Sequence, residues 1–186
     1  LNGFSLNLQA PDKPVVTFSV PHGFFYAPFT LRLTSDHSAA RIYYTTDGST
    51  PGMANGSLYT APLQVNTTLV IRAVAILNSD AGKVATASYI FPEEVLHQPE
   101  LPSGYPAQWG KYSDISGTAK SDYGMDPEIV DHPLYRELVV PALLSVPTVS
   151  LVMKKAHLFS GTAHPDSGGI YIFTGANGKT GDNWER

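Results

Sequence analysis

The stretch RIYYTTDGSTPGMANGSLYTAPL (41–63) places a β-rich run directly before an Asp-Gly turn signal. Because side chains alternate along a strand, Tyr43 and Tyr44 should lie on opposite faces, one in a core and one towards solvent or a partner. Gly48 can adopt a positive φ, and the Asp47 carboxylate can accept hydrogen bonds from nearby backbone N–H groups. The stretch therefore predicts a strand followed by a turn, with a ligand-binding loop as the alternative.

Neighbouring runs share this strand-like character, because they are short and rich in Val, Ile, Thr, Tyr and Phe. They are VVTFS (15–19), FTLRLTS (29–35), RIYYTT (41–46), TLVIRAVAI (68–76) and VATASYIF (84–91). In the second run, Phe29, Leu31 and Leu33 alternate with polar residues. Strands at this spacing, separated by turn residues and without helical patterns between them, predict a mainly β fold built as a small antiparallel sandwich.

The same region resembles a known family. The motifs that carry the resemblance are IYYTTDGSTP (42–51), YTAPL (59–63), TTLVIRAVA (67–75) and YIF (89–91). They are similar to the chitobiase/β-hexosaminidase C-terminal-type domain, a fibronectin-III-associated, Ig-like module of many bacterial surface and secreted proteins. The resemblance implies an Ig-like β-sandwich over residues 1–91. It also implies an accessory module beside a catalytic domain, without catalytic residues of its own.

Residues 92–125 differ in composition, with four Pro, little periodicity and several large aromatics. Such a segment could be a loose linker. Tyr105, Trp109 and Tyr123, however, would be costly to leave in water. We therefore expect an extended but ordered segment that packs on a neighbour.

Residues 126–186 are predicted to form a small α+β region, the start of a downstream domain. Asp126 is a candidate N-cap and Pro127 suits the first helical position. Pro133 and Pro141 favour two short helices over one continuous helix. Further elements are expected along this part of the chain: a strand at 147–153, a helical turn at 154–160 and a strand at 168–175.

The second half carries a further resemblance. LPSGYPAQWG (101–110), VPTVSLVM (146–153) and GIYIFTGANGKTGDNWER (169–186) are similar to the lead-in of bacterial proteins related to the spore-coat kinase, of CotH type. In such kinases the nucleotide-binding Lys and the acidic metal ligands would follow after residue 186, and no residue here matches them. Since the chain also lacks an initial Met, we expect a fragment of a longer protein.

Composition excludes several kinds of function. The formal net charge is -4, and the 12 Lys and Arg are scattered without a basic stripe, which argues against nucleic acid as a partner. With no Cys there is no disulfide, thiolate nucleophile or Cys-ligated zinc. The His residues show no metal-binding spacing, so no metal and no cofactor are expected. No apolar run is long enough for a membrane-spanning helix.

Aromatic side chains are the remaining functional candidates, because Tyr and Trp on an exposed sandwich face can stack on sugar rings. The candidate ligand-binding residues are Tyr43, Tyr44, Tyr59, Tyr105, Trp109 and Tyr112. No catalytic residue is assigned. For each aromatic the competing interpretation is packing within or between domains.

Three functions therefore remain open. The first is a non-catalytic accessory or spacer module of an extracellular or cell-envelope protein, with the rest of the parent polypeptide as its partner. The second is a carbohydrate-binding module with a polysaccharide partner. The third is an enzyme whose site lies at the junction of the two halves, where His or carboxylate side chains would have to converge in a pocket.

Overall fold

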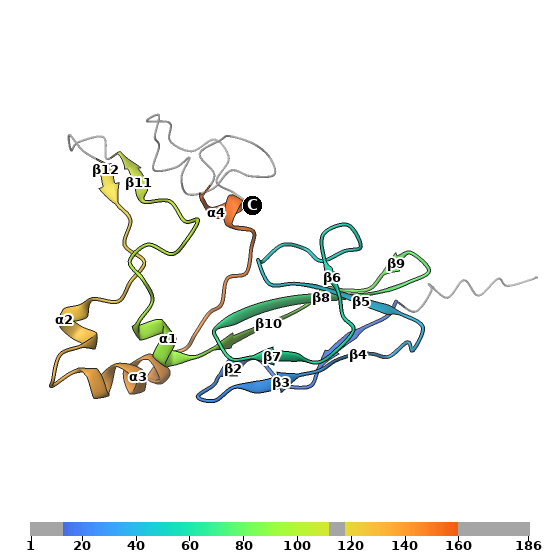
Figure 1. Ribbon diagram of the computed structural model, residues 1–186, viewed down its shortest axis with the longest axis horizontal. Helices are drawn as coiled ribbons and strands as arrows, with labels where there is room; N and C mark the ends of the chain where they lie inside the picture. The colour runs from blue at the N-terminus through green and yellow to red at the C-terminus, as the bar shows by residue number, and fades with distance from the viewer. Residues whose placement is uncertain (1–12, 112–117, 160–186) are drawn as a thin grey trace, which may run out of the picture.

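The computed structural model describes residues 13–111 and 118–159 of the chain, and Figure 1 shows two packed β layers with short helices at one end. The larger sheet has the strand order β2-β10-β8-β5-β6, and β9 also pairs with β8. Its strands are β2 (Gly23–Phe24), β5 (Arg41–Thr45), β6 (Ser57–Leu58), β8 (Leu69–Leu77), β9 (Asp80–Ala81) and β10 (Ala85–Ile90). Its pairs are antiparallel except that of β2 with β10, which is parallel.

The second layer consists of two strand pairs, β1 with β4 and β3 with β7. The strands are β1 (Val16–Phe18), β3 (Phe29–Leu31), β4 (Leu33–Ser35) and β7 (Leu63–Val65). The predicted strand 29–35 is thus divided at Arg32, where the chain crosses from one pair to the other. Ser19 bridges the break: its N–H donates to the Arg32 carbonyl at 2.9 Å, and its hydroxyl accepts from the Arg32 N–H at 2.9 Å.

The hydrophobic core lies between the two layers. Ile71, Ala73 and Ala75 of β8 face Leu31 and Val65 of the second layer, and all five are buried. This arrangement follows from alternation, because every second residue of β8 points to the same side. The predicted mainly β sandwich is therefore confirmed.

Tyr89 of β10 is the largest fully buried side chain in this core. Its ring packs edge-on against Phe25 and Phe29, at centroid distances of 5.6 and 5.2 Å. Its hydroxyl donates a 2.8 Å hydrogen bond to the carbonyl of Val20. Burial raises the pKa of Tyr89 to about 12.

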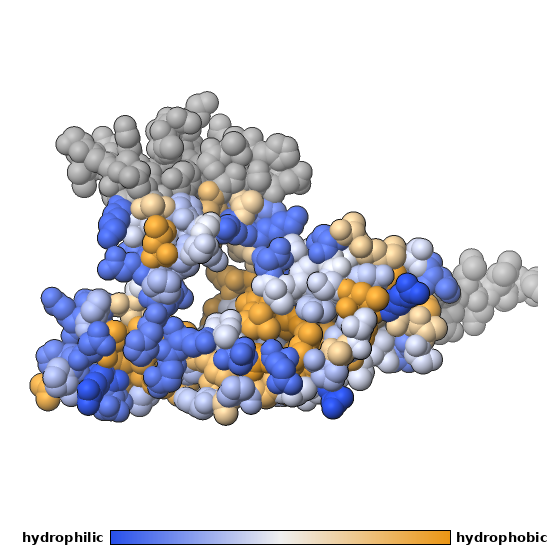
Figure 2. Space-filling view, viewed as in Figure 1, coloured by the Kyte–Doolittle hydropathy of each residue, from blue (hydrophilic) through white to orange (hydrophobic). Residues whose placement is uncertain are grey.

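A small helical cluster follows the sandwich and has its own apolar contacts. Its helices are α1 (Pro92–Leu96), α2 (Pro127–Val130) and α3 (Arg136–Ser145). Leu96, Val130 and Val139, one from each helix, form its buried centre. Figure 2 shows that the exposed surface of this part is mostly hydrophilic, whereas hydrophobic residues gather on the visible face of the sandwich.

The prediction of two short helices, the first starting after Asp126, is confirmed by α2 and α3. The Asp126 side chain caps α2 by accepting a 2.9 Å hydrogen bond from the N–H of Glu128. The chain then leaves the helical conformation around Pro133. Pro141, in contrast, lies inside α3. There it removes the helical bond to the carbonyl of Glu137, an exposed residue near the start of the helix.

Regular structure also occurs within 92–125, where none was predicted. Besides α1, the strands β11 (Gln108–Lys111) and β12 (Thr118–Lys120) pair as an antiparallel hairpin. Helix α1 is joined closely to the sandwich, because the Phe91 N–H donates to the Thr68 hydroxyl at 3.0 Å. In turn, the Thr68 N–H donates to the Glu94 carboxylate.

The predicted strand at 147–153 is wrong. Residues 146–154, here called the strap, are extended but pair with no strand in the described part of the chain. The strap runs from α3 past the sandwich to α4 (Lys155–Phe159), as Figure 1 shows, and α4 confirms the predicted helical turn. The strap contacts strand β10 through side chains: the hydroxyls of Ser88 and Ser150 share a 2.6 Å hydrogen bond. The predicted strand at 168–175 lies outside the described residues.

Candidate functional site

The loop after β5 is held by its own hydrogen bonds. The Asp47 carboxylate accepts from the Ser49 N–H at 3.0 Å and from the Ser49 hydroxyl at 2.6 Å. Thr45 donates through its hydroxyl to the Ser49 carbonyl at 2.6 Å, and Asn55 donates to the Thr50 carbonyl at 2.8 Å. The bond from the Ser49 N–H to the Asp47 carboxylate is that of an Asx turn, so the predicted strand and turn are confirmed.

The same bonds set the charge state of the loop. Hydrogen bonds from the hydroxyl and the N–H of Ser49 hold the pKa of Asp47 below its ordinary value near 3.8. The positive charge of Lys154, on the strap, lowers this pKa further. Asp47 is therefore ionised at neutral pH and stands within the electrostatic influence of the strap.

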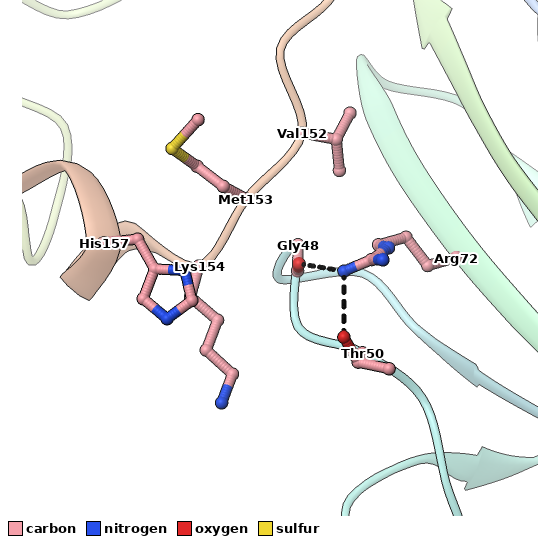
Figure 3. A pocket seen from close by; sticks show the side chains of 7 residues that line it. All are labelled: Gly48, Thr50, Arg72, Val152, Met153, Lys154 and His157. Carbon is pink, nitrogen blue, oxygen red and sulfur yellow. Dashed lines mark hydrogen bonds between the residues drawn. The ribbon is translucent and has the colours of Figure 1, made fainter. Parts of the chain in front are cut away.

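Arg72 ties this loop to the centre of the larger sheet. Its Nη1 donates to the Gly48 carbonyl at 2.9 Å and to the Thr50 hydroxyl at 3.3 Å (Figure 3). Arg72 lies opposite Thr45 in the register of β8 with β5. The arginine therefore leaves the sheet on the side away from the core and reaches the loop that follows the neighbouring strand.

Gly48 is the point at which the loop meets the strap. Its φ is 77°, a conformation that favours glycine. A β-carbon at this position would stand 2.2 Å from the carbonyl oxygen of Met153. Both backbone conformation and close approach thus require glycine here.

Loop, sheet and strap together border a pocket of about 500 Å³ that is partly open to solvent, here called the junction pocket. Its lining comes from Gly48 and Thr50 of the loop, Arg72 of β8, and Val152–Lys154 and His157 of the strap and α4. Figure 3 shows these side chains around the point where the loop and the strap approach each other. The lining has two permanent cations, one imidazole and no carboxylate, so the pocket suits an anion better than a cation or a metal ion.

The aromatic candidates of the sandwich are held by the fold. Tyr44 packs against the core, and Tyr43 lies half-buried on the opposite side of β5. Tyr59 also packs against the core, and its hydroxyl accepts a 3.1 Å hydrogen bond from the Leu33 N–H. The structure does not gather these three side chains into one exposed patch.

The candidates of the second half occupy a different place. Tyr105 packs edge-on against Tyr123 at 5.4 Å and against Phe159 of α4 at 5.6 Å between ring centroids. The Lys155 ammonium lies 5.1 Å from the Tyr105 ring centroid, within cation–π range. This contact anchors α4 to the 92–125 segment. The side chain of Trp109 and the whole of Tyr112 lie outside the described residues.

Sequence reasoning missed the three basic residues of the junction pocket. Arg72 offered a local signal, because it interrupts the apolar run LVIRAVAI in a central strand. Lys154 and His157 offered none, since nothing in the sequence indicates that residues so far along the chain return to β8. Their convergence is a long-range feature of the fold.

The described ranges show neither a metal-ligand cluster nor a bilayer span. Within 13–111 and 118–159, His, Asp and Glu side chains nowhere gather in a group of three or more that could hold a metal ion. No helix in these ranges has the length and hydropathy needed to cross a membrane.

Comparison with known proteins gives a family match over part of the sandwich. Residues 31–89 match the Fn3-associated family. This Fn3-associated segment extends from the end of β3 to β10 and includes the loop at 46–50, so the resemblance to the chitobiase C-terminal-type domain is confirmed for these residues. No curated protein and no solved structure matches the chain. The resemblance of the second half to CotH-type proteins stays a prediction.

Proposed function

We propose that this protein is a non-catalytic accessory module that positions a following domain in a larger bacterial surface or secreted protein. The Fn3-associated segment supports the accessory role, since such modules stand beside other domains. The following domain would be CotH-kinase-like, as the motifs of residues 101–186 suggest. The location would be extracellular or at the cell envelope.

The observation that carries the proposal is the path of the strap. The chain leaves the sandwich after β10, forms the helical cluster and then returns to the outer side of the larger sheet. There Ser150 bonds to Ser88, and Met153 lies against Gly48. A linker that merely trailed away from the sandwich would make none of these contacts.

A second set of contacts fixes the end of the strap. Phe159 packs against Tyr105 and Tyr123, and Lys155 donates a hydrogen bond to the Gly104 carbonyl. Helix α4 is thus held by the strap on one side and by the 92–125 segment on the other. Any polypeptide that follows α4 therefore starts from a defined place, which is the physical requirement for a positioning module.

Neither alternative function has comparable support. A polysaccharide-binding face would need several exposed, coplanar aromatics, and the described candidates are instead half-buried or in ring–ring contacts. An enzyme at the junction of the halves would need an acid–base pair, whereas the junction pocket is lined by one His and no carboxylate.

A distance measurement tests the positioning role. Because the chain has no Cys, one pair of spin labels can be attached to a double variant with Thr34→Cys in β4 and Ala156→Cys in α4. Both positions are exposed. Pulsed electron paramagnetic resonance should give one narrow distance distribution between them. The pair Thr34→Cys with Thr86→Cys, both within the sandwich, is the matched control. A distribution for Ala156 much broader than the control would overturn the proposal.

The carbohydrate alternative has its own test. Binding of the native chain to cellulose, chitin and xylan should be absent in a pull-down. Retention that is lost in Tyr105→Ala, a residue that is 41% exposed, would instead make the protein a carbohydrate-binding module.

A further inference from the structure

The junction pocket concentrates positive charge from distant parts of the chain. Arg72 comes from β8, whereas Lys154 and His157 come from the strap and α4. None of the ion pairs within the described ranges includes Arg72 or Lys154. An anionic ligand in the pocket would offset these charges.

Asp47, an acidic residue that interacts with Lys154, offsets this charge only in part. Asp47 is influenced by Lys154 through space, but its carboxylate is occupied by the Ser49 N–H and hydroxyl, at 3.0 and 2.6 Å. At neutral pH the set of Asp47, Arg72 and Lys154 carries one net positive charge. The pocket is therefore electropositive even before His157 is considered.

The donors of the pocket are also incompletely used. Arg72 donates through Nη1 alone, and its other guanidinium N–H groups bond to no described residue. The ammonium of Lys154 and the imidazole of His157 likewise have no hydrogen-bond partner in the described ranges. The adjacent Lys155 provides a contrast, since it donates to the Gly104 carbonyl and lies over the Tyr105 ring.

A simple solvated basic surface explains these observations less well. Lysines that only keep a surface soluble are spread over it, whereas here a central strand contributes an arginine in place of an apolar residue. The loop carbonyl of Gly48 fixes that arginine, which reduces the entropy lost when the guanidinium binds a ligand. The cavity, at about 500 Å³, is in the size range of small-molecule sites.

We propose that the junction pocket binds a small organic oxyanion, a carboxylate or a phosphate ester, between Arg72, Lys154 and His157. A guanidinium and an ammonium donate charge-assisted hydrogen bonds to such oxygens. Val152 and Met153 provide apolar surface for the carbon part of the ligand. The site is independent of the positioning role, because the native chain could hold its strap with or without the anion.

Isothermal titration calorimetry of the whole chain at low salt tests this site. The probes are sodium phosphate and sodium glucuronate, with glucose as the uncharged control. We expect heat of binding for at least one anion and none for glucose. Saturable binding of phosphate alone assigns the phosphate class, and that of glucuronate alone assigns the carboxylate class.

Variants separate a built site from general charge attraction. Lys154→Met should weaken anion binding by about tenfold, the effect of removing one charge-assisted hydrogen bond. His157→Gln should weaken it less. Lys83→Met, an exposed lysine outside the pocket, removes the same charge and should leave the affinity unchanged. Absence of binding for both anions, or equal losses in Lys154→Met and Lys83→Met, would overturn the proposal.

Discussion

Gly48 and Met153 are in backbone contact although they belong to different parts of the chain. A β-carbon on Gly48 would stand 2.2 Å from the Met153 carbonyl oxygen and 2.8 Å from its carbonyl carbon. This contact couples the turn of the sandwich to the strap. The turn, which the sequence indicated only as a local feature, is therefore also the surface on which the returning strap packs.

The first prediction concerns this contact. Gly48→Ala should displace the strap, because the added methyl group cannot share space with the Met153 carbonyl. The positive φ adds about 1–2 kcal/mol of strain to the loop. Amide hydrogen exchange of residues 146–154 should become faster, and the midpoint of thermal unfolding should fall.

Gly52→Ala is the matched control, since it lies in the same loop and its new β-carbon would be no closer than 3.4 Å to any neighbour. It should leave strap exchange unchanged. Equal exchange in native protein and Gly48→Ala would show that the strap does not rest on the loop.

The second prediction concerns Arg72. Arg72→Met keeps much of the side-chain volume but removes the hydrogen bonds to the Gly48 carbonyl and the Thr50 hydroxyl. We expect the free energy of unfolding to fall by about 1–3 kcal/mol, as measured by urea denaturation. Arg41→Met, at an exposed position of β5, is the control and should cost much less. Similar losses for the two arginines would contradict a specific role for Arg72.

The third prediction concerns Tyr89. Tyr89→Phe removes the hydroxyl that donates to the Val20 carbonyl, and should lower the free energy of unfolding by about 1 kcal/mol. The pKa of Tyr89 is raised by burial from 10.0 to about 12. Its neutral form is thus favoured in the folded state, so the stabilisation is present below pH 10 and is lost as the pH rises towards 12.

Urea denaturation across this alkaline range provides the measurement. The native chain should lose stability more steeply with pH than Tyr89→Phe, which has no phenol at this position. Parallel pH profiles would show that Tyr89 ionises as freely in the folded protein as in the unfolded one.

The fourth prediction concerns the pKa of Asp47 and the stability of the protein at low pH. The pKa of Asp47 is lowered first by the Ser49 hydroxyl, so Ser49→Ala should raise it towards its ordinary value near 3.8. A group with a lowered folded pKa stabilises the fold above its unfolded pKa and ceases to do so as the pH falls through the folded one. The Asp47 hydrogen bonds should therefore contribute fully to stability above pH 3.8, and this contribution should be lost as the pH falls further.

Carbon-13 NMR titration of the Asp47 carboxyl group gives both pKa values directly. Ser57→Ala, in the exposed edge strand β6, is the control and should not shift the Asp47 titration. An unchanged Asp47 pKa in Ser49→Ala would show that the hydrogen bond from the Ser49 hydroxyl does not cause the lowered pKa.

Local sequence patterns were sufficient to predict most strands of the sandwich and the turn after β5. The alternation in 29–35 placed Phe29, Leu31 and Leu33 on one face, and Asp-Gly identified the turn, because both signals act between residues close in sequence. The resemblance to the chitobiase C-terminal-type domain also agrees with the family match over residues 31–89. The division of 29–35 at Arg32 was not predictable, since it depends on Ser19 from another strand pair.

The strap shows why the site was missed. PTVSLVM has the composition of a strand, but a strand also needs a free sheet edge, and here the segment lies on the face of β8 and β10 instead. The contacts of Ser150 and Met153 join residues 62 or more positions apart. No periodicity in a single sequence reports such a contact, so Lys154 and His157 could not be assigned to a common pocket with Arg72.

The two boundary strands of the larger sheet, β2 and β6, are only two residues long each. Exposed sheet borders with long runs of unpaired N–H and C=O groups recruit other chains and lead to aggregation. Borders this short offer little template for such pairing. Many copies of this sandwich could therefore be crowded side by side, as on a densely covered surface, without joining into a common sheet.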